Sequence, residues 1–365
     1  NGKRILMSER TLNEIIDQRK EKIKALVADG INPYPHNFDR SHLITEALES
    51  FDDLQGKKGT RLAGRLMSRR VMGKASFANI MDGSGKLQLY IGRDDIGVDV
   101  YMMFKQLDIG DFVGVSGELM TTRTGEKTLK VHELTLLSKN IRPLPNVKEK
   151  DGQLFDGFED KEQRYRKRYL DLIVNPDVKE TFVKRAKIYR SIRTFFDNSD
   201  YLEVETPILQ PLYGGASARP FKTHHNALDI DLFLRIADEL YLKRLIIGGF
   251  EKVFEFSRNF RNEGMDRTHN PEFTAIEWYE AYVDYFYLMD QVESLFKHLA
   301  TDLDQSTFEF NDHEIDLTKP FDRATMAELV QKHANVDLSK ADAAELLKVC
   351  REHKIDAASD ANYGQ

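Results

Sequence analysis

Residues Val253–Tyr282 read VFEFSRNFRNEGMDRTHNPEFTAIEWYEAY, which is the most informative segment of the chain. At its start, phenylalanines alternate with Glu255 and Ser257, which is the periodicity of a strand. A polar loop over Met265–Pro271 separates this run from a second run, rich in apolar and aromatic residues, that begins at Glu272. Two such runs joined by a short connection predict a pair of antiparallel strands.

Charged side chains of both signs are concentrated on this predicted hairpin. The basic ones are Arg258, Arg261, Arg267 and His269, and the acidic ones are Glu263, Glu272, Glu277 and Glu280. On a half-buried sheet these charges are unfavourable unless they pair with one another or bind a ligand that is charged at both ends. A surface network of ion pairs meets the first condition, and a site for a nucleotide together with an amino acid meets the second.

Three strings of this stretch resemble the second signature motif of class II aminoacyl-tRNA synthetases, and the lysine-specific members are the most similar. The strings are FRNE at Phe260–Glu263, HNPEFT at His269–Thr274 and EWYEAY at Glu277–Tyr282. The resemblance implies an α+β protein with an N-terminal OB-fold β-barrel and a class II catalytic domain built on an antiparallel sheet. It also implies a lysine–tRNA ligase that uses ATP and Mg²⁺ to activate L-lysine and passes it to the 3′ end of tRNA(Lys).

The resemblance assigns the chemistry of the first step to Arg261. A carboxylate must attack the α-phosphate of ATP, and an arginine fork can bind both anions and stabilise the charge that develops between them. No general base is needed, because the attacking carboxylate is already ionised. Arg261 is therefore the expected catalytic residue. The expected ATP-binding residues are Arg261, Glu263 on the adenine amine, Phe273 stacked on the ring, and Arg258, His269 and Asn270.

The resemblance also places the lysine substrate. The backbone at Gly215 and the carboxylate of Glu239 are expected at its α-ammonium, and Arg261 at its carboxylate. Glu277 and Tyr279 are expected at the side-chain ammonium, where an acidic group and a hydroxyl suit a cation at the end of an apolar stem. Glu239 also stands in the first turn of a predicted helix, where the helix dipole alone favours a carboxylate.

Short strands and turn signals fill residues 60–140. The expected strands are Arg61–Val71, Ala75–Asp82, Lys86–Gly92, Asp111–Met120 and Thr128–Ser138, with a helical stretch near Val98–Leu107. Five strands of this spacing predict a small closed barrel of the OB type, a fold that binds single-stranded nucleic acid.

The resemblance makes this barrel the anticodon-binding domain. The residues expected at the anticodon are Arg69, Arg70, Phe77, Gln88 and Glu133. An aromatic ring and an amide on adjacent strands suit an unstacked uridine. The residues alone favour a core aromatic of the barrel for Phe77, and the resemblance reverses that interpretation.

The flanking segments complete four expected domains. These are an N-terminal helical extension over 1–59, the barrel over 60–140, a linker or hinge over 141–176 and the front portion of the catalytic domain over 177–365. Ser8–Gly30 predicts an amphipathic helix whose Lys20, Lys22 and Lys24 form either a solvated face or a tRNA contact. Arg164–Val178 is either an RNA-facing hinge helix or an ion-paired helix.

Phe182–Asn198 predicts a helix, and Tyr201–Leu209 predicts an apolar strand ended by Pro207. This order resembles the first class II motif. It implies a homodimer with Pro207 at the interface.

Composition sets outer bounds. The chain has 365 residues, enough for at least two domains, and 41% of them are hydrophobic, so sizeable cores can form. Its formal net charge of −7 argues against unselective coating of nucleic acid. Cys350 is the only cysteine, which fits a cytoplasmic protein. No apolar run is long enough to span a membrane, so no membrane partner is expected. His224 and His225 are adjacent on a predicted strand and therefore point to opposite faces, so no metal ligands are expected in this chain.

One departure from the family pattern concerns the third class II motif, which is rich in glycine. After Gly264 the only glycine is Gly364, so this motif is absent, and the Mg²⁺ ligands are expected to lie with it outside this chain. Thr301–Gln365 reads as helical connecting material. We expect this chain by itself to bind ATP poorly and to catalyse little. The alternatives are a noncatalytic tRNA-binding or regulatory module, a sister ligase for aspartate or asparagine, and a paralogue that lysylates a protein, which the predicted barrel disfavours.

Overall fold

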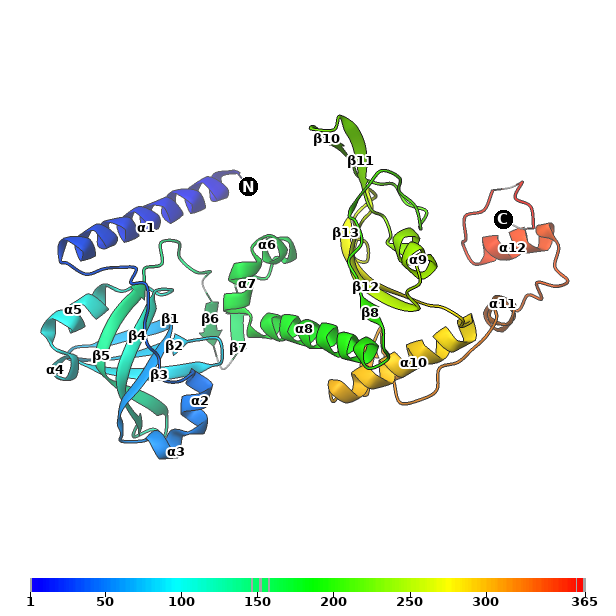
Figure 1. Cartoon of the computed structure of the whole chain (residues 1–365). Helices are drawn as coiled ribbons and strands as arrows, with labels where there is room; N and C mark the ends of the chain where they lie inside the picture. Colours follow the sequence, from blue (N-terminus) through cyan, green and yellow to red (C-terminus); the bar gives the residue numbers. More distant parts are fainter. Residues whose placement is uncertain (1, 146, 151–152, 157, 359, 364–365) are drawn as a thin grey trace. The chain divides into compact units, whose positions relative to one another are not determined.

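The computed structural model describes residues 2–145, 147–150, 153–156, 158–358 and 360–363. The chain divides into two compact units, Asn1–Val178 and Lys179–Gln365, and each is described by itself (Figure 1). No helix within the described ranges combines the length and apolar character that crossing a bilayer requires.

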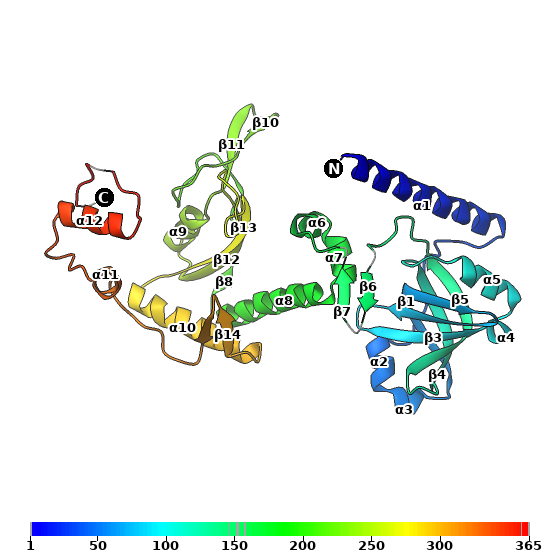
Figure 2. The same cartoon turned by 180° about the vertical axis from the view of Figure 1, so that it is seen from behind.

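The first unit is built around a closed five-stranded barrel, which confirms the predicted OB fold (Figure 2). Its strands are β1 (Lys58–Met72), β2 (Ala75–Met81), β3 (Lys86–Gly92), β4 (Phe112–Thr121) and β5 (Lys127–Ser138), in the order β1-β2-β3-β5-β4. The short helices α2 (Ile44–Glu49), α3 (Phe51–Leu54), α4 (Arg93–Ile96) and α5 (Val98–Gln106) surround it. Alternate strand residues such as Leu62, Ile80 and Leu89 are fully buried inside the barrel.

The N-terminal helix α1 (Gly2–Ala28) begins before the predicted start at Ser8 and is tied to the barrel by charge. Lys22 donates to Asp108 at 2.6 Å, so it does not belong to a freely solvated face. Asp108 and Asp111 also accept from Lys139, whose ammonium is fully buried between them. These contacts, together with the burial of Leu26 in the hydrophobic core of the unit, hold the amphipathic helix on the barrel.

The segment expected as a linker or hinge contains regular structure. A hairpin of β6 (Val147–Lys150) and β7 (Gln153–Asp156) precedes the helices α6 (Lys161–Arg166) and α7 (Arg168–Val174). The buried carboxylate of Asp171 accepts from Arg164 at 2.8 Å and from Asn175 at 2.7 Å, and it also pairs with Arg168. Of the two interpretations of Arg164–Val178, the ion-paired helix describes these side chains.

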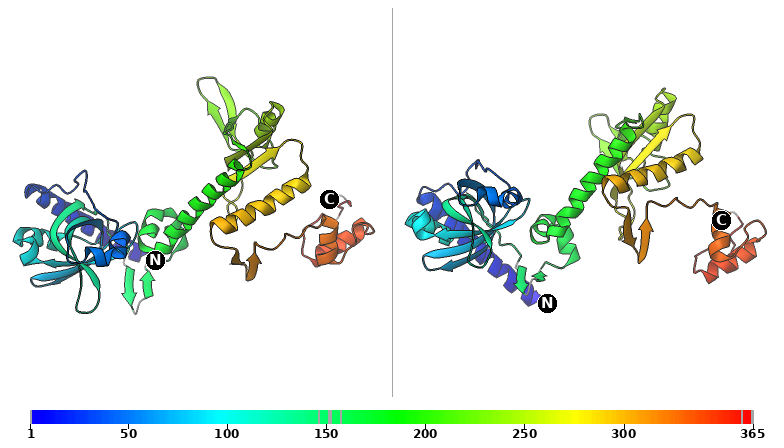
Figure 3. Two further views of the ribbon diagram at one scale, coloured as in Figure 1. Left: turned by 60° about the horizontal axis from the view of Figure 1, so that its bottom comes forward. Right: turned by 90° about the horizontal axis from the view of Figure 1, so that it is seen from below.

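The second unit contains a sheet of order β13-β12-β8, formed by β8 (Leu202–Glu203), β12 (Lys252–Phe260) and β13 (Glu272–Glu280). The antiparallel pairing of β12 with β13 confirms the hairpin predicted from the sequence. Helices α8 (Pro176–Asp197) and α10 (Tyr285–Asp302) lie against one face of it (Figure 3). Phe196 of α8 stacks on Phe254 with ring centroids 4.8 Å apart, and Trp278 donates to Gln291 of α10 at 2.6 Å.

A second sheet, of order β10-β11-β9, and helix α9 lie in the same unit. Their bounds are β9 (Leu209–Gln210), β10 (Lys222–His225), β11 (Ile230–Leu234) and α9 (Glu239–Ile247). The predicted single strand Tyr201–Leu209 is wrong, because only its two ends are paired as strands. Proline at 207 has no N–H to donate to a ladder, which fits the break between them.

The remaining chain forms a hairpin of β14 (Thr307–Phe310) and β15 (His313–Asp316), followed by α11 (Met326–Ala334) and α12 (Ala343–Glu352). The expectation of wholly helical material over Thr301–Gln365 is therefore wrong. The hairpin turns at Asn311 and Asp312, both of which have positive φ. Asn and Asp tolerate this conformation better than most residues, and such turns join antiparallel strands closely.

Candidate active site and nucleic-acid interface

The β12–β13 hairpin has one aromatic face and one polar face. Its register pairs Glu255 with Glu277 and Asn259 with Phe273, and paired residues of antiparallel strands share a face. This polar face is not solvent-facing along β12, because Glu255, Ser257 and Asn259 are each at most 3% exposed. Along β12 the alternation predicted from the sequence therefore separates an aromatic face from a polar face that is also buried. Buried polar side chains need hydrogen-bond or ion-pair partners, so the candidate site is described through those partners.

A buried ion pair fixes the centre of this face. Arg235, which follows β11, donates to Glu255 at 2.7 Å, and both side chains are nearly inaccessible to solvent. The guanidinium also donates to the carbonyl and hydroxyl of Thr206 and to the carbonyl of Arg258. The second oxygen of Glu255 accepts from the Thr206 hydroxyl at 2.7 Å. One pair therefore holds together the segment before β9, the end of β11 and strand β12.

Arg261 lies at the end of the same polar face. Its backbone N–H donates to the carbonyl of Pro271 at 2.9 Å, which closes the loop, and its guanidinium lies 5.1 Å from the ring centre of Phe273. Its Nε lies 3.4 Å from the carbonyl of Ile236, so the side chain is directed along the segment that leads into α9. The half-buried guanidinium is thereby oriented by the protein.

Acidic groups gather at the start of α9 and on β13. Asp238 is fully buried, Glu239 pairs with Lys243 at 2.6 Å, and the hydroxyl of Tyr279 donates to Glu277 at 3.2 Å. Burial, followed by the hydrogen bond with Asp238, raises the pKa of Glu277 to about 7. The pKa of Tyr279 is also raised, by burial and by the charge of Glu277. A group of carboxyls like this one is suited to a cationic ligand.

Gly215 lies directly against this group. Its φ is +85°, and a Cβ built on it would stand 3.0 Å from the Cβ of Glu239 and 3.2 Å from the Cβ of Ala237. A side chain at this position would be strained in conformation and crowded against α9, so glycine is required here. The structure brings Gly215, Glu239, Glu277 and Tyr279 to one region, as the sequence interpretation requires.

The loop after β12 is ordered by one carboxylate that the sequence analysis did not single out. Asp266 accepts from the backbone N–H groups of Thr268 and His269, each at 2.7 Å, and from the His269 ring. These hydrogen bonds hold the pKa of Asp266 well below its usual range. Glu263 accepts from the backbone N–H of Arg219 at 3.3 Å, and Asn270 donates to the carbonyl of Glu272. Glu263, His269 and Asn270 are all exposed on this loop.

Arg258 is separated from the other expected ATP residues. The register pairs it with Thr274, on the face that also carries Phe254 and Phe256, and its guanidinium is 3.3 Å from the carboxylate of Glu272. Arg261 and Phe273 belong to the opposite face. The structure therefore does not bring Arg258 together with them.

On the barrel, two cross-strand rows lie side by side on the outward face of the strands, and of their members only Thr128 is fully buried. The first row is Arg70, Phe77, Tyr90 and Lys130, and the second is Ser68, Asn79, Gln88 and Thr128. Phe77 is half-exposed and contacts Tyr90 edge-on, with ring centroids 5.5 Å apart, so it is not a core aromatic. Gln88 accepts from Thr128 at 2.8 Å.

The other two residues expected at the anticodon have different surroundings. The Arg69 guanidinium donates to the carbonyls of Phe104 and Lys105 at the end of α5, so it stabilises that helix terminus. Glu133 is exposed on β5, opposite Ser116 of β4. Tyr90 and Lys130 were missed by the sequence analysis. Strand pairing could have found them, because Tyr90 has the same parity as Gln88 on its strand.

Two segments of the chain match models of known families. Residues 160–358 match the family model of tRNA synthetases class II (D, K and N). The chain belongs to this family. Residues 60–137 match the OB-fold nucleic acid binding domain.

Lysine–tRNA ligases are similar to this chain along most of its length. That of Porphyromonas gingivalis is 51% identical over 342 residues, which are 91% of this chain and 59% of the relative. That of Christiangramia forsetii is 49% identical over 365 residues, covering 97% of this chain and 63% of the relative. That of Thermoanaerobacter is 47% identical over 357 residues and is covered to 70% of its length. The chain spans about three fifths of the first two relatives.

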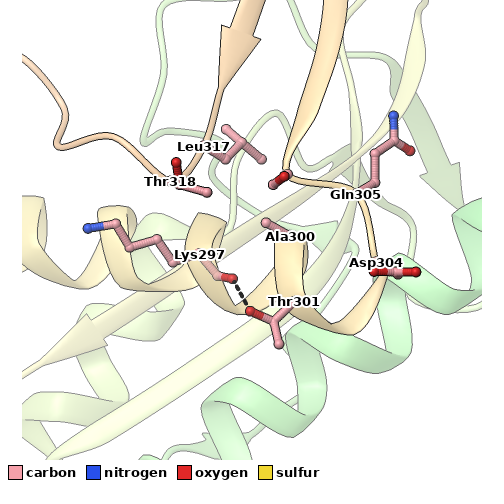
Figure 4. Close-up of a pocket in the computed structure, with 8 residues that line it drawn as sticks. Lys297, Ala300, Thr301, Asp304, Gln305, Leu317 and Thr318 are labelled. Atoms are coloured by element: carbon pink, nitrogen blue, oxygen red, sulfur yellow. Dashed lines mark hydrogen bonds between the residues drawn. The ribbon is translucent and has the colours of Figure 1, made fainter.

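Two cavities of the second unit lie apart from the candidate active site. One, of about 530 Å³, lies between the end of α10 and the residues after β15, where Thr301 donates to the carbonyl of Lys297 (Figure 4). The other, of about 960 Å³, is lined mainly by apolar side chains of α11, α12 and the segment after them. Neither contains a residue that the sequence analysis assigned to a site.

The buried ion pair gives a test of how the site is built. Arg235→Met should lower the free energy of unfolding by about 3–5 kcal/mol, because it leaves Glu255 buried without its cation. Urea unfolding followed by circular dichroism measures the change. Arg235→Met combined with Glu255→Met should recover part of the loss, while Arg193→Met, which breaks the exposed pair with Glu203, should change stability by less than about 1 kcal/mol. Equal stabilities of Arg235→Met and wild type would contradict this account.

Proposed function

We propose that this synthetase is a lysine–tRNA ligase that activates L-lysine with ATP and transfers it to the 3′ end of tRNA(Lys). The observation that carries the proposal is the arrangement on one face of β12–β13. Arg261 lies at one end of this face, and Glu277, Tyr279 and Glu239 lie about the start of α9. A zwitterion with a second, cationic end matches a site that has an oriented arginine and a group of carboxyls.

In the proposed first step, a carboxylate oxygen of lysine attacks the α-phosphorus of ATP. The new bond is the mixed anhydride of lysyl-adenylate, and the bond to the β-phosphate oxygen breaks to release pyrophosphate. Arg261, the proposed catalytic residue, binds both anions and stabilises the transition state without any proton transfer. Phe273, which already contacts the guanidinium, would stack on adenine, with Glu263 at its exocyclic amine. In the second step the ribose hydroxyl of tRNA displaces AMP.

His269 and Asn270 complete the proposed nucleotide site, with His269 at the distal phosphates. Asp266 holds the backbone of His269, and Asn270 is held by the carbonyl of Glu272, so the loop needs little reorganisation to receive an anion. Arg258 is left out of this proposal because of its place on the other face.

Mg²⁺ is the metal that the family implies beside ATP, where it would neutralise phosphate charge. Within the described residues no three His, Cys, Asp or Glu side chains are grouped as a metal site would require. The residues present do not fit the ion, and no step of the mechanism is assigned to it. We propose a cytoplasmic location, as for a protein that acts on tRNA.

The group of carboxyls favours lysine over the acidic substrate of a sister ligase. Glu239 and Glu277 would repel the side chain of aspartate, whereas both attract an ammonium. An asparagine side chain would leave Glu277 with no cation. The preference is therefore electrostatic, and removal of one charge should weaken it.

Lysine-dependent exchange of pyrophosphate into ATP, measured on the full-length protein, tests the function. We expect exchange with lysine and none with aspartate. Arg261→Lys should lower kcat by about 10²–10³, because a lysine cannot form the two-pronged contact. Glu277→Gln should raise KM for lysine more than it lowers kcat. Asp290→Asn, which alters an exposed pair on α10, is the control for charge and should behave as wild type. Exchange with aspartate instead of lysine would refute the assignment.

We propose that the outer rows of the barrel bind the anticodon, with Phe77 as the stacking surface and Gln88 and Arg70 beside it. Glu133 is proposed for a neighbouring base, and Arg69 supports the surface through α5.

Phe77→Ala should weaken tRNA(Lys) binding by about 1–3 kcal/mol, as loss of one stacked base does. It should leave the barrel folded, because the ring is half-exposed. Filter binding measures the affinity, and Phe112→Ala, an exposed aromatic on β4, is the matched control. Equal losses in both variants would exclude a specific stacking role.

We propose a homodimer with Pro207 at its interface. Exposed apolar side chains cluster in the sequence around this proline, namely Leu202, Ile208, Leu209 and Leu212. An apolar run of this kind on a folded surface is typical of an interface. Ile208→Asp should shift the protein to monomers in sedimentation equilibrium, because a buried unpaired carboxylate opposes association. Val98→Asp, at an exposed apolar position on α5, should not. A monomeric wild type at micromolar concentration would overturn the proposal.

A further inference from the structure

Asp238 occupies the position that normally caps a helix, yet it does not cap α9. It immediately precedes Glu239, the first residue of the helix, and its side chain makes no capping hydrogen bond. Instead Oδ1 accepts from Ser257 at 3.0 Å and lies 3.4 Å from the amide nitrogen of Asn259, both on β12. An aspartate at this position usually stabilises the first turn of its own helix. This one is turned toward the polar face of the hairpin.

The other oxygen of Asp238 is buried and has no hydrogen-bond donor among the described residues. The same holds for Oδ1 of Asn259 next to it. The neighbouring group is the carboxyl of Glu277, which is within hydrogen-bonding reach of Asp238. Two carboxyls in contact away from water cannot both be ionised unless a cation or a shared proton lies between them.

The charges around this pair are already balanced by other partners. From β12, Glu255 faces Glu277 but is paired with Arg235, and from α9, Glu239 is paired with Lys243. Tyr279 contributes a neutral hydroxyl from β13, and Ser257 and Asn259 contribute neutral donors. Arg261 stands at the far end of the face, against Ile236 and Phe273. In the part of the chain that the structure describes, neither Asp238 nor Glu277 forms an ion pair with Lys, Arg or His.

We propose that Glu277 holds one proton against the unpartnered oxygen of Asp238 and releases this proton when the substrate ammonium binds, which makes Asp238 a specificity-determining residue. This inference rests on the proposed function, since it concerns the ammonium that Glu277 binds. The balance is simple: the proton of Glu277 leaves to solvent, and the positive charge of the ammonium takes its place against the Glu277 carboxylate. Asp238 acts through Glu277 as a positioning residue, and it adds a second negative charge behind the first.

The release of a proton couples lysine binding to pH. Because Glu277 has its pKa raised to about 7, it is protonated below that pH and ionised above it. The ammonium binds the ionised form, so lysine affinity should rise as the pH increases through 7. A neutral amino acid side chain could not displace the proton. The pair would therefore discriminate against uncharged substrates as well as acidic ones.

Isothermal titration calorimetry of L-lysine into the full-length protein, in two buffers of different ionisation enthalpy, measures the protons released. We expect about 0.5 proton per lysine at pH 7 and an affinity about tenfold higher at pH 8 than at pH 6. Asp238→Asn should reduce both the release at pH 7 and the pH effect to less than about half of the wild-type values, because Glu277 loses the hydrogen bond and the charge of Asp238 although it stays buried. Asp290→Asn, remote and exposed, should keep the wild-type values.

Several outcomes would overturn the proposal. The first is lysine binding by the wild type without proton release at pH 7, which contradicts the proposal even if Asp238→Asn fails to fold. The second is a folded Asp238→Asn variant that keeps the wild-type pH profile. The third is a Glu277→Gln variant that still releases a proton when it binds lysine. These results would leave lysine-dependent exchange, and hence the proposed function, intact. Failure of the full-length wild type to bind lysine or to support exchange would refute both.

Discussion

The buried pair of Arg235 and Glu255 is the constraint on which the second unit depends. Its guanidinium and carboxylate together contact Thr206, the carbonyl of Arg258 and each other, so three segments distant in sequence meet at one charge pair. Arg235 also directly precedes Ile236, whose carbonyl lies against the guanidinium of Arg261. The orientation of the proposed catalytic arginine is thereby coupled to an interaction that no substrate touches. Such supporting contacts keep a site within the narrow geometry that catalysis needs.

The two faces of the β12–β13 hairpin divide the work of folding and binding. Phe254, Phe256 and Trp278 pack with α8 and α10, and this aromatic cluster provides the hydrophobic stabilisation of the sheet. The opposite face can then carry buried polar groups, whose desolvation would be prohibitive in a sheet held together by that face alone. The charged side chains of the hairpin are tolerated because the aromatic face holds the strands in place.

The sequence predicted those elements whose signal is local. Alternation around Glu255 gave the hairpin strands, and regular turn signals gave the five barrel strands. The hairpin after α10 was missed although Asn311 and Asp312 offered a turn signal, because the flanking strands are short and exposed. The break near Pro207 was missed because an apolar run outweighed the lack of a backbone donor. In each case the local pattern was ambiguous and tertiary pairing decided the outcome.

The site was only partly predictable, for a different physical reason. Glu277 and Arg261 were found through resemblance. The register places Glu277 on the polar face, and Arg261 follows the last paired residue of β12 at the end of that face. Arg235 is one basic residue after a strand, and nothing in the local sequence marks its partner 20 residues later, which only the fold supplies. Asp238 looks like an ordinary helix cap, and a cap is what its position predicts.

The carboxylate of Asp238 could either cap α9 or turn toward β12 beside Glu277, and the sequence does not show which. Capping would stabilise α9 by about 1 kcal/mol. Turning toward β12 forgoes that contribution and buries an acid beside Glu277, where it raises the pKa of its neighbour. A fold selected only for stability would keep the cap, so the observed orientation indicates a requirement of another kind. Since Ser257 and Asn259 stabilise Asp238 without neutralising it, the arrangement preserves negative charge next to Glu277. A cationic substrate is the ligand that such a preserved charge suits.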